Sequence, residues 1–145
     1  MANPRFKGSG VALVTPFDDT GVNEAVLRAL VRFHHEAGTA ALVVCGSTGE
    51  AATMTPAEQR FAVEVVVDEN GGRLPVIAGC GGSDTAVVAR LAVQAREAGA
   101  DALLVSAPPY NKPTQRGLVA HYRAILDAAD LPLIVYNVPG RCGVN

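Results

Sequence analysis

The sequence predicts an α/β fold with a parallel central sheet. Of its 145 residues, 49% are hydrophobic but only 5% are aromatic, so the core must be built from Val, Leu, Ile and Ala. This composition suits strands rich in Val and Ile that alternate with helices rich in Ala and Leu. The apolar residues also form continuous runs, which are typical of parallel strands covered on both faces.

Five of these apolar runs are the predicted strands. Their starts recur roughly every 30 residues, which is the length of one βα unit. Two of them begin with Leu-Pro, and a proline at the first residue of a strand removes no ladder hydrogen bond. The predicted strands are residues 10–15, 40–45, 74–79, 102–106 and 131–136.

Four helices are predicted between the strands. They are residues 23–37, a segment that begins at Thr55, residues 84–98 and residues 115–128. At the start of the second, Thr55 is followed by Pro56 and then by Glu58 three residues after the cap, which is the pattern of a capping box. Two of the helices show apolar positions at helical spacing. These positions are Val26, Leu27, Leu30, Val31 and His34 in the first helix, and Leu118, Tyr122, Ile125 and Leu126 in the fourth.

This order of elements fits two architectures, a doubly wound sheet or the first part of a (β/α)8 barrel. A complete barrel needs about 250 residues. A chain of 145 residues would therefore supply only its first five strands and four helices. No linker or shift of composition marks a second domain, so residues 1–145 are expected to be the N-terminal portion of a single, incomplete barrel domain.

Composition and charge argue against several classes of function. The net charge is -2 and the charges are scattered singly, so neither a nucleic-acid surface nor a basic membrane-binding segment is expected. The N-terminus lacks the apolar core of a signal peptide, and the apolar runs are far shorter than the roughly 20 residues that cross a bilayer. Three widely spaced cysteines favour a reduced, cytoplasmic protein, and the histidines and cysteines predict no metal site.

In either architecture, functional residues gather at the carboxyl ends of the parallel strands. The most unusual sequence there is Gly46-Ser47-Thr48-Gly49, directly after the second strand. One interpretation is a turn whose hydroxyls satisfy local backbone groups. The other interpretation is a turn that binds a small anion. A dinucleotide site is disfavoured, because Asp84 stands where the last glycine of G-x-G-x-x-G is needed.

Other residues at these strand ends also allow two readings. Tyr110 lies in a loop between prolines, where it is either a surface aromatic residue or a residue that transfers protons. Tyr136 ends a strand expected to be buried, so its hydroxyl needs a partner. Arg141 is either a solvated charge or a clamp for a carboxylate. Glu50 is expected to cap or orient its loop, and Cys45 to pack as a small core hydrophobe.

Three motifs carry a resemblance to a known family. GSTGE follows the second strand, PPYNKPTQRGL the fourth and YNVPGR the fifth. Over residues 8–145 the chain resembles the dihydrodipicolinate synthase group of pyruvate-dependent class I aldolases. GSTGE and the YN-P motif are shared with N-acetylneuraminate lyases and related sugar-acid aldolases. The PYNKP loop and the position of Arg141 favour the synthase.

The resemblance implies a (β/α)8 barrel lyase that condenses pyruvate with aspartate-4-semialdehyde in diaminopimelate and lysine biosynthesis. Pyruvate would be held as a Schiff base on a lysine, without a cofactor. That lysine lies on the sixth strand of the family, beyond Asn145, and neither Lys7 nor Lys112 is placed for this role. The chain by itself is therefore expected to lack its nucleophile. The alternatives are a sugar-acid aldolase of the neuraminate-lyase type or an inactive truncated piece.

The resemblance also implies roles for the residues of the glycine-flanked turn. Ser47 matches the relay hydroxyl, which is usually threonine in the family. Thr48 matches a residue that helps to hold the pyruvate carboxylate. Gly46 belongs to the same substrate-binding turn, where glycine lets the backbone approach a ligand closely.

Three further roles follow from the resemblance. Tyr136 matches the tyrosine that shuttles protons to and from the Schiff-base centre. Tyr110 matches the tyrosine lent across a dimer interface, so a neighbouring copy is needed. The resemblance to the family implies a homotetramer built as a dimer of dimers. Arg141 matches the group that receives the carboxylate of the second substrate.

One departure from the family concerns feedback regulation. Members inhibited by lysine place a cluster of histidine, asparagine and glutamate near the GTTGE helix and the tyrosine loop. The corresponding positions are Pro56, Gln59, Ser83 and Val87, with Pro109 in place of a second tyrosine. These side chains are poorly suited to hold an ammonium group, so weak or absent lysine feedback is predicted.

Overall fold

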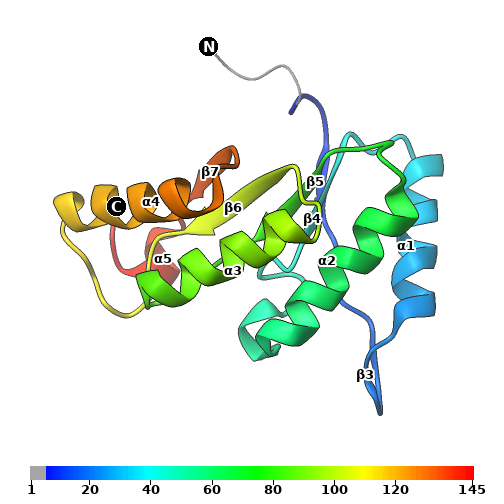
Figure 1. Ribbon diagram of the computed structural model, residues 1–145, viewed down its shortest axis with the longest axis horizontal. Coiled ribbons are helices and arrows are strands. Elements are labelled where there is room, and N and C mark those ends of the chain that lie inside the picture. The colour runs from blue at the N-terminus through cyan, green and yellow to red at the C-terminus, as the bar shows by residue number, and fades with distance from the viewer. Residues whose placement is uncertain (1–5) are drawn as a thin grey trace.

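The computed structural model describes residues 6–145 and contains the predicted parallel sheet (Figure 1). Its five strands are hydrogen-bonded in the order in which they occur along the chain, and every neighbouring pair is parallel. The strands are β1 (Gly10–Ala12), β4 (Ala41–Val44), β5 (Val76–Gly79), β6 (Ala102–Ser106) and β7 (Leu133–Tyr136).

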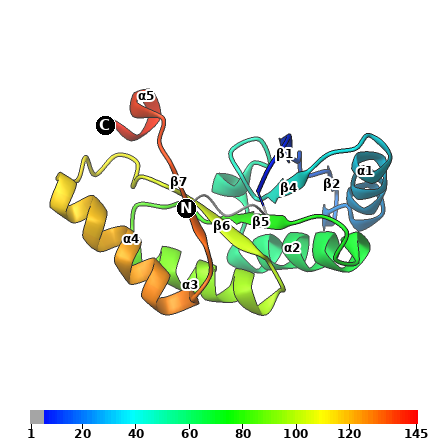
Figure 2. The same cartoon turned by 90° about the horizontal axis from the view of Figure 1, so that it is seen from above.

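Four long helices form one layer on one face of this sheet (Figures 1 and 2). Each helix contacts the next one along the chain. A doubly wound sheet would reverse its strand order and place helices on both faces, so the arrangement is that of a (β/α)8 barrel. The helices are α1 (Glu24–Glu36), α2 (Pro56–Asn70), α3 (Thr85–Glu97) and α4 (Gln115–Ala129).

The long helices begin where the sequence predicts. In the capping box of α2, Thr55 Oγ1 accepts a hydrogen bond from the Glu58 N–H at 3.3 Å, and Glu58 Oε2 accepts one from the Thr55 N–H at 2.7 Å. Side-chain oxygens of Asn23, Asp84 and Thr114 cap α1, α3 and α4 in the same manner. Local side-chain chemistry therefore sets these boundaries.

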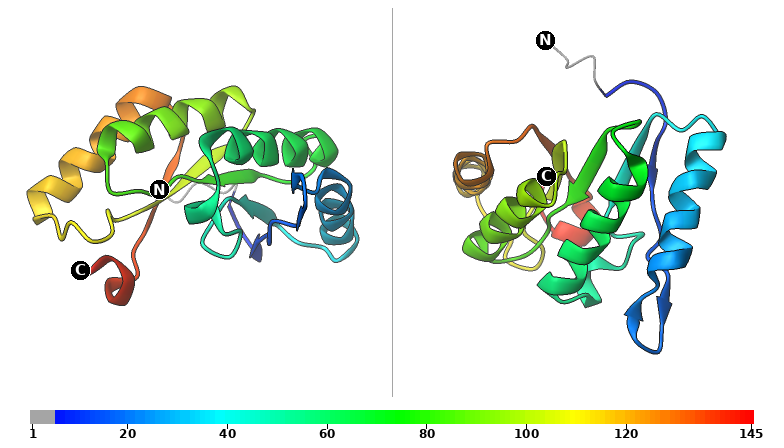
Figure 3. Two further views of the ribbon diagram at one scale, coloured as in Figure 1. Left: turned by 90° about the horizontal axis from the view of Figure 1, so that it is seen from below. Right: turned by 45° about the vertical axis from the view of Figure 1, so that its right-hand side comes forward.

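Three small features were not predicted. They are a hairpin of β2 (Phe17–Asp18) and β3 (Gly21–Val22), a 3₁₀ turn η1 (Ala51–Thr53) and a fifth helix, α5 (Pro139–Cys142). The short helix α5 lies on the opposite side of the sheet from the helix layer (Figure 2; Figure 3, left). The prediction of four helices was thus one short, and this extra helix carries Arg141.

The two faces of the sheet support separate hydrophobic cores. The larger core lies between the sheet and the helix layer. The smaller core lies on the opposite face of the sheet, called the inner face below, where Phe6 packs against it. Fully buried members of the larger core include Leu27, Val31, Leu42, Val66, Val76, Val88, Leu103 and Ile125, and the inner core is centred on Ala41, Ile77 and Ala102.

The last strand is not buried, which corrects the prediction. Val135 is 58% exposed and Tyr136 is 37% exposed. Strands β4, β5 and β6 are each followed by a long helix that packs on the sheet, whereas α5 is a single turn on the other side. Two predicted stripe residues, Val26 and Leu126, are also exposed, because they lie at the edges of the buried helix faces.

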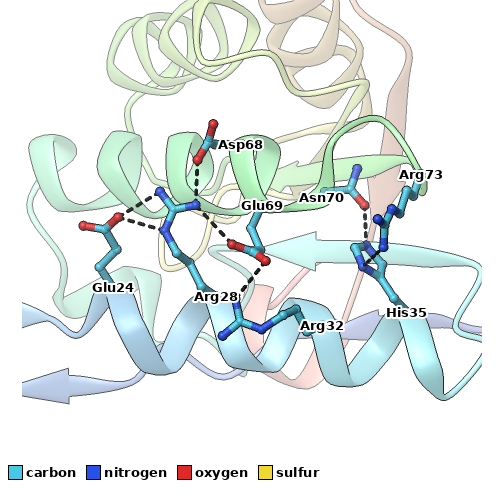
Figure 4. A network of polar contacts seen from close by, with 8 residues as sticks. All are labelled: Glu24, Arg28, Arg32, His35, Asp68, Glu69, Asn70 and Arg73. Atoms are coloured by element: carbon cyan, nitrogen blue, oxygen red, sulfur yellow. Dashed lines mark hydrogen bonds and ion pairs between the residues drawn. The ribbon is translucent and has the colours of Figure 1, made fainter.

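A network of charged side chains joins α1 to α2 on the outer surface (Figure 4). The guanidinium of Arg28 contacts Asp68 at 2.6 Å, Glu24 at 2.8 Å and Glu69 at 3.3 Å. Arg32 contacts Glu69 at 2.8 Å. Exposed pairs of this kind contribute little individually, and several charges that form a network contribute more than isolated pairs.

The end of α2 is held by a buried asparagine. Asn70 is 2% exposed, and its amide group bonds both the carbonyl and the N–H of Leu74, at 2.7 and 3.1 Å. His35 Nε2 lies 3.1 Å from Asn70 Oδ1, which ties α1 to the same corner (Figure 4).

Across residues 6–145, no helix is both long enough and apolar enough to span a membrane.

Candidate functional site

The predicted functional residues all lie at the carboxyl edge of the sheet. Ser47 and Thr48 follow β4, Tyr110 follows β6, Tyr136 ends β7, and Arg141 lies in α5. Parallel strands in sequential order bring these segments to one edge. Within residues 6–145, however, no hydrogen bond or ion pair joins any two of the five side chains.

The turn after β4 exposes hydrogen-bond donors. It is closed by hydrogen bonds from the Gly49 N–H to the Gly46 carbonyl, at 3.1 Å, and from the Glu50 N–H to the Ser47 carbonyl, at 3.2 Å. Ser47 and Thr48 are exposed, and in the described part of the chain neither their N–H groups nor their hydroxyls have partners. The turn can therefore offer several donors to one small anion.

The end of β1 supports this turn from behind. Thr15 is 7% exposed, and its hydroxyl donates a 2.6 Å hydrogen bond to the Gly49 carbonyl. A Cβ atom on Gly49 would lie 3.0 Å from the Leu13 carbonyl oxygen and 3.1 Å from Thr15 Oγ1, so glycine fits this position best. Thr15 was not among the predicted site residues. Its only sequence signal is a hydroxyl at the end of an apolar run.

A close backbone approach joins the ends of β4 and β5. Cys45 has a left-handed φ of +56°, and a Cβ atom on Gly79 would lie only 2.2 Å from the Cys45 carbonyl oxygen. The thiol of Cys45 points into the helix layer, where it contacts the Gln59 carbonyl at 3.6 Å. Burial raises the pKa of Cys45 to about 12. The residue thus packs as a small core hydrophobe, as predicted, and is not an activated nucleophile.

The loops after β5 and β6 are joined by side-chain hydrogen bonds. Ser83 Oγ donates to the Pro109 carbonyl at 2.9 Å, and Asn111 Nδ2 donates to the Ser83 carbonyl at 2.6 Å. Between Pro109 and Asn111, Tyr110 has a φ of +70° and is 92% exposed. A left-handed non-glycine residue costs on the order of 1–3 kcal/mol, so its surroundings must hold it there.

Tyr136 stands beside the end of β6. It pairs in register with Ser106, and its carbonyl accepts a 3.2 Å hydrogen bond from the Ala107 N–H. A partner for its hydroxyl was expected, but none is found within residues 6–145. Because Tyr136 is on the same strand face as Ile134, its ring faces the inner side of the sheet.

The helix α5 is held against the loop between β6 and α4, which contains Tyr110 and is called the tyrosine loop below. A Cβ atom on Gly143 would lie 3.2 Å from Cε of Lys112, so the stem of this lysine covers the end of α5. Cys142 is buried in a small cluster with Ala107 and Leu118. These contacts leave Arg141 exposed, and it has no ion-pair partner within residues 6–145.

The expectation for Glu50 was wrong as regards its side chain. Glu50 is the residue before η1, but its carboxylate makes no cap hydrogen bond. Instead, its carbonyl accepts hydrogen bonds from the Thr53 N–H at 3.0 Å and from Thr53 Oγ1 at 2.9 Å. The backbone, with a φ of +57°, therefore shapes this corner.

As for metals, residues 6–145 contain no group of three or more His, Cys, Asp or Glu side chains that could hold an ion.

Comparison with known proteins identifies the family. Residues 5–145 match the dihydrodipicolinate synthetase family. The chain belongs to this family. The resemblance inferred from the three motifs is thereby confirmed.

Relatives within the dihydrodipicolinate synthetase family are similar in sequence and in structure. The 4-hydroxy-tetrahydrodipicolinate synthase of Thermoanaerobacter sp. (strain X514) is 52% identical over 142 residues, which cover 98% of this chain and 48% of the relative. The dihydrodipicolinate synthase of Aquifex aeolicus is 46% identical with a TM-score of 0.93, over 97% of this chain and 48% of that one. The Acinetobacter baumannii enzyme, solved in complex with pyruvate, is 47% identical with a TM-score of 0.92, and the match covers 95% of this chain and 48% of that one.

The chain thus spans about half the length of the family members it matches. The half that it spans contains the glycine-flanked turn, the tyrosine loop and the strand that ends in Tyr136. The roles of the individual residues remain predictions.

Proposed function

We propose that this chain supplies the pyruvate-binding edge of a 4-hydroxy-tetrahydrodipicolinate synthase, a lyase that condenses pyruvate with aspartate-4-semialdehyde. One observation carries the proposal: Ser47 and Thr48 expose N–H and hydroxyl groups, unpaired within residues 6–145, at the carboxyl edge of a parallel sheet. A carboxylate accepts several such donors at once. A family relative solved with pyruvate supports this choice of ligand.

In the proposed reaction, a lysine amine attacks the keto carbon of pyruvate and water leaves, which forms an imine. Loss of a proton from the methyl carbon gives an enamine, and this carbon then bonds the aldehyde carbon of the second substrate, whose oxygen takes up a proton to become a hydroxyl. The amino group of that substrate then displaces the lysine from the imine carbon, which closes the ring and releases the lysine. We assign the amine to a lysine outside residues 1–145. Lys112 is exposed and its stem lies over Gly143, whereas a Schiff-base amine must be desolvated or placed near a cation to lose its proton.

Proton transfer is assigned to Ser47, Tyr136 and Tyr110. A free tyrosine titrates near 10, so it needs hydrogen-bonded partners to exchange protons quickly at neutral pH. Tyr136 faces the inner side of the sheet, where the bound imine would lie. Tyr110 is 92% exposed, which suits a residue that enters the site of a second copy.

The remaining assignments follow the same proposal. Arg141 is free to clamp the carboxylate of the second substrate with two parallel hydrogen bonds. Thr48 and the Gly46 backbone hold the carboxylate of pyruvate. Residues 1–145 form the N-terminal portion of a single barrel domain in a cytoplasmic homotetramer, a dimer of dimers in which Tyr110 lies at the dimer interface. The product then enters diaminopimelate and lysine biosynthesis.

Reduction with borohydride in the presence of pyruvate tests the proposal. A Schiff base becomes a stable adduct, so we expect a mass increase in the protein expressed from its complete coding sequence and none in residues 1–145. Product assays with aspartate-4-semialdehyde and with N-acetylneuraminate then separate synthase from sugar-acid lyase activity. Absence of an adduct in both proteins, or turnover of the sugar acid only, would rule out the synthase.

A further inference from the structure

We propose that Ser83 and Asn111 are positioning residues that hold Tyr110 in its outward conformation. The inference rests on the proposed function, in which Tyr110 completes the proton relay of a neighbouring copy. It adds the physical means by which an exposed tyrosine is kept in one orientation.

Tyr110 occupies the centre of a three-residue turn. The Asn111 N–H donates a 2.8 Å hydrogen bond to the Pro109 carbonyl, and the φ of Tyr110 is +70°. A turn of this sign is rare and strained. Lys112, two residues later, is also left-handed, with a φ of +47°. Two such residues, separated only by Asn111, persist only where the surroundings fix them.

The ring of Tyr110 does not provide this support. Its side chain is 92% exposed, so almost none of it packs against the described part of the chain. The direction in which the side chain leaves the main chain is therefore set by the backbone on either side of Tyr110.

Ser83 is hydrogen-bonded to the residues on both sides of Tyr110. Before Tyr110, the Pro109 carbonyl accepts a 2.9 Å hydrogen bond from Ser83 Oγ. After Tyr110, the Asn111 side chain donates a 2.6 Å hydrogen bond to the Ser83 carbonyl. One residue of the loop after β5 thus bonds both neighbours of the tyrosine.

The far end of the loop is anchored independently. Thr114 caps α4, and the stem of Lys112 covers Gly143. Because Ser83 and Asn111 are both exposed, substitutions there release the turn without opening the core.

Amide exchange at Asn111 measures the clamp directly. The Asn111 N–H closes the strained turn, so its exchange rate reports how often the turn opens. We expect Ser83→Ala and Asn111→Ala each to raise the exchange rate of the residue 111 amide. The expected increase is about 2- to 10-fold, the factor that corresponds to the loss of one hydrogen bond. Ser83→Thr keeps the hydroxyl and should restore the slow rate. Ser9→Ala is the matched control, because Ser9 is exposed and its hydroxyl has no partner within residues 6–145.

Kinetics of the protein expressed from its complete coding sequence test whether the clamp acts through Tyr110. We expect Ser83→Ala to lower kcat by a larger factor than it raises KM for pyruvate. In a Tyr110→Phe background the same substitution should change kcat no further, since the hydroxyl that it positions is already absent.

The outcomes separate this inference from the proposed function. Unchanged exchange at residue 111, or an equal loss of kcat in both backgrounds, overturns the positioning role. If Tyr110→Phe itself leaves kcat unchanged, the proposed relay role of Tyr110 fails. The exchange measurement then still decides whether Ser83 and Asn111 hold the turn.

Discussion

The hydroxyl of Thr15 donates a 2.6 Å hydrogen bond to the carbonyl of Gly49. This contact joins the segment after β1 to the turn that presents Ser47 and Thr48, across 34 positions of sequence. Both partners are buried, so water does not replace the bond if it is lost. The binding turn therefore depends on a residue that cannot itself reach a ligand at the exposed surface.

Thr15→Val should destabilise the protein. It keeps the shape of the side chain but leaves the buried Gly49 carbonyl without its donor, which costs about 1–3 kcal/mol. Thr15→Ser retains the hydroxyl and serves as the control. Urea unfolding should show a lower midpoint for the valine variant only, and equal midpoints for both variants would contradict this reading.

Gly79→Ala should disrupt the junction between β4 and β5. The added Cβ would lie 2.2 Å from the Cys45 carbonyl oxygen, so the turn backbone must move. Overpacking of this kind costs about 1–3 kcal/mol, occasionally more. Gly140→Ala is the matched control, since a Cβ there meets nothing within 4 Å. Thermal unfolding of the two variants compares them, and similar midpoints would refute the steric argument.

Stability should fall in mild acid because of His121. This residue is 3% exposed, its Nδ1 lies 2.8 Å from Thr85 Oγ1, and within residues 6–145 its Nε2 has no partner. Burial lowers the pKa of His121 below its ordinary value of 6.5. The unfolded chain therefore takes up a proton that the folded state resists, so unfolding becomes easier as the pH falls below about 6.5.

His121→Leu should flatten this pH dependence. Urea unfolding between about pH 7.5 and 5.5 would measure it, a window that lies above the range in which ordinary carboxylates titrate. The variant should lose less stability than the parent across that window. An identical slope in both proteins would mean that His121 does not carry the effect.

The core cysteines should resist alkylation in the folded protein. Burial raises the pKa of both Cys45 and Cys80 to about 12, and the thiolate is the reactive form. Iodoacetamide at about pH 8 should label neither residue until urea is added. Rapid labelling of Cys45 in the native state, located by peptide mass spectrometry, would show that the turn opens more readily than its contacts suggest.

Lysine should inhibit weakly or not at all. Gln59 is occupied with the Ala51 and Met54 carbonyls, at 2.8 and 3.4 Å, and Ser83 with the Pro109 carbonyl. Neither offers a carboxylate to an ammonium group, and Val87 is apolar. A lysine titration of the synthase activity of the protein expressed from its complete coding sequence should show no inhibition at millimolar lysine. Tight inhibition by lysine would refute this prediction.

Much of the fold could be read from local chemistry in the sequence. The capping box at Thr55 and the cap at Asp84 set the helix starts, because a side chain and the N–H groups it binds lie within a few residues. The continuous apolar runs identified the strands, since a parallel sheet covered on both faces needs them. The choice between a barrel-type and a doubly wound sheet depends on how distant segments pair, so the periodicity of the sequence left it open.

The tertiary structure decided how the candidate site is held together. No pattern in the sequence indicates that Thr15 bonds Gly49, that Gly79 meets the Cys45 carbonyl, or that Ser83 bonds both neighbours of Tyr110. These contacts join residues that are more than 25 positions apart, and only the parallel pairing of the strands brings them together. The sequence by itself determined which polar residues follow each strand, because their positions along the chain are fixed. The contacts that support these residues were decided by packing, because hydrogen bonds and steric contacts between two loops form only after strand pairing places the loops at the same edge of the sheet.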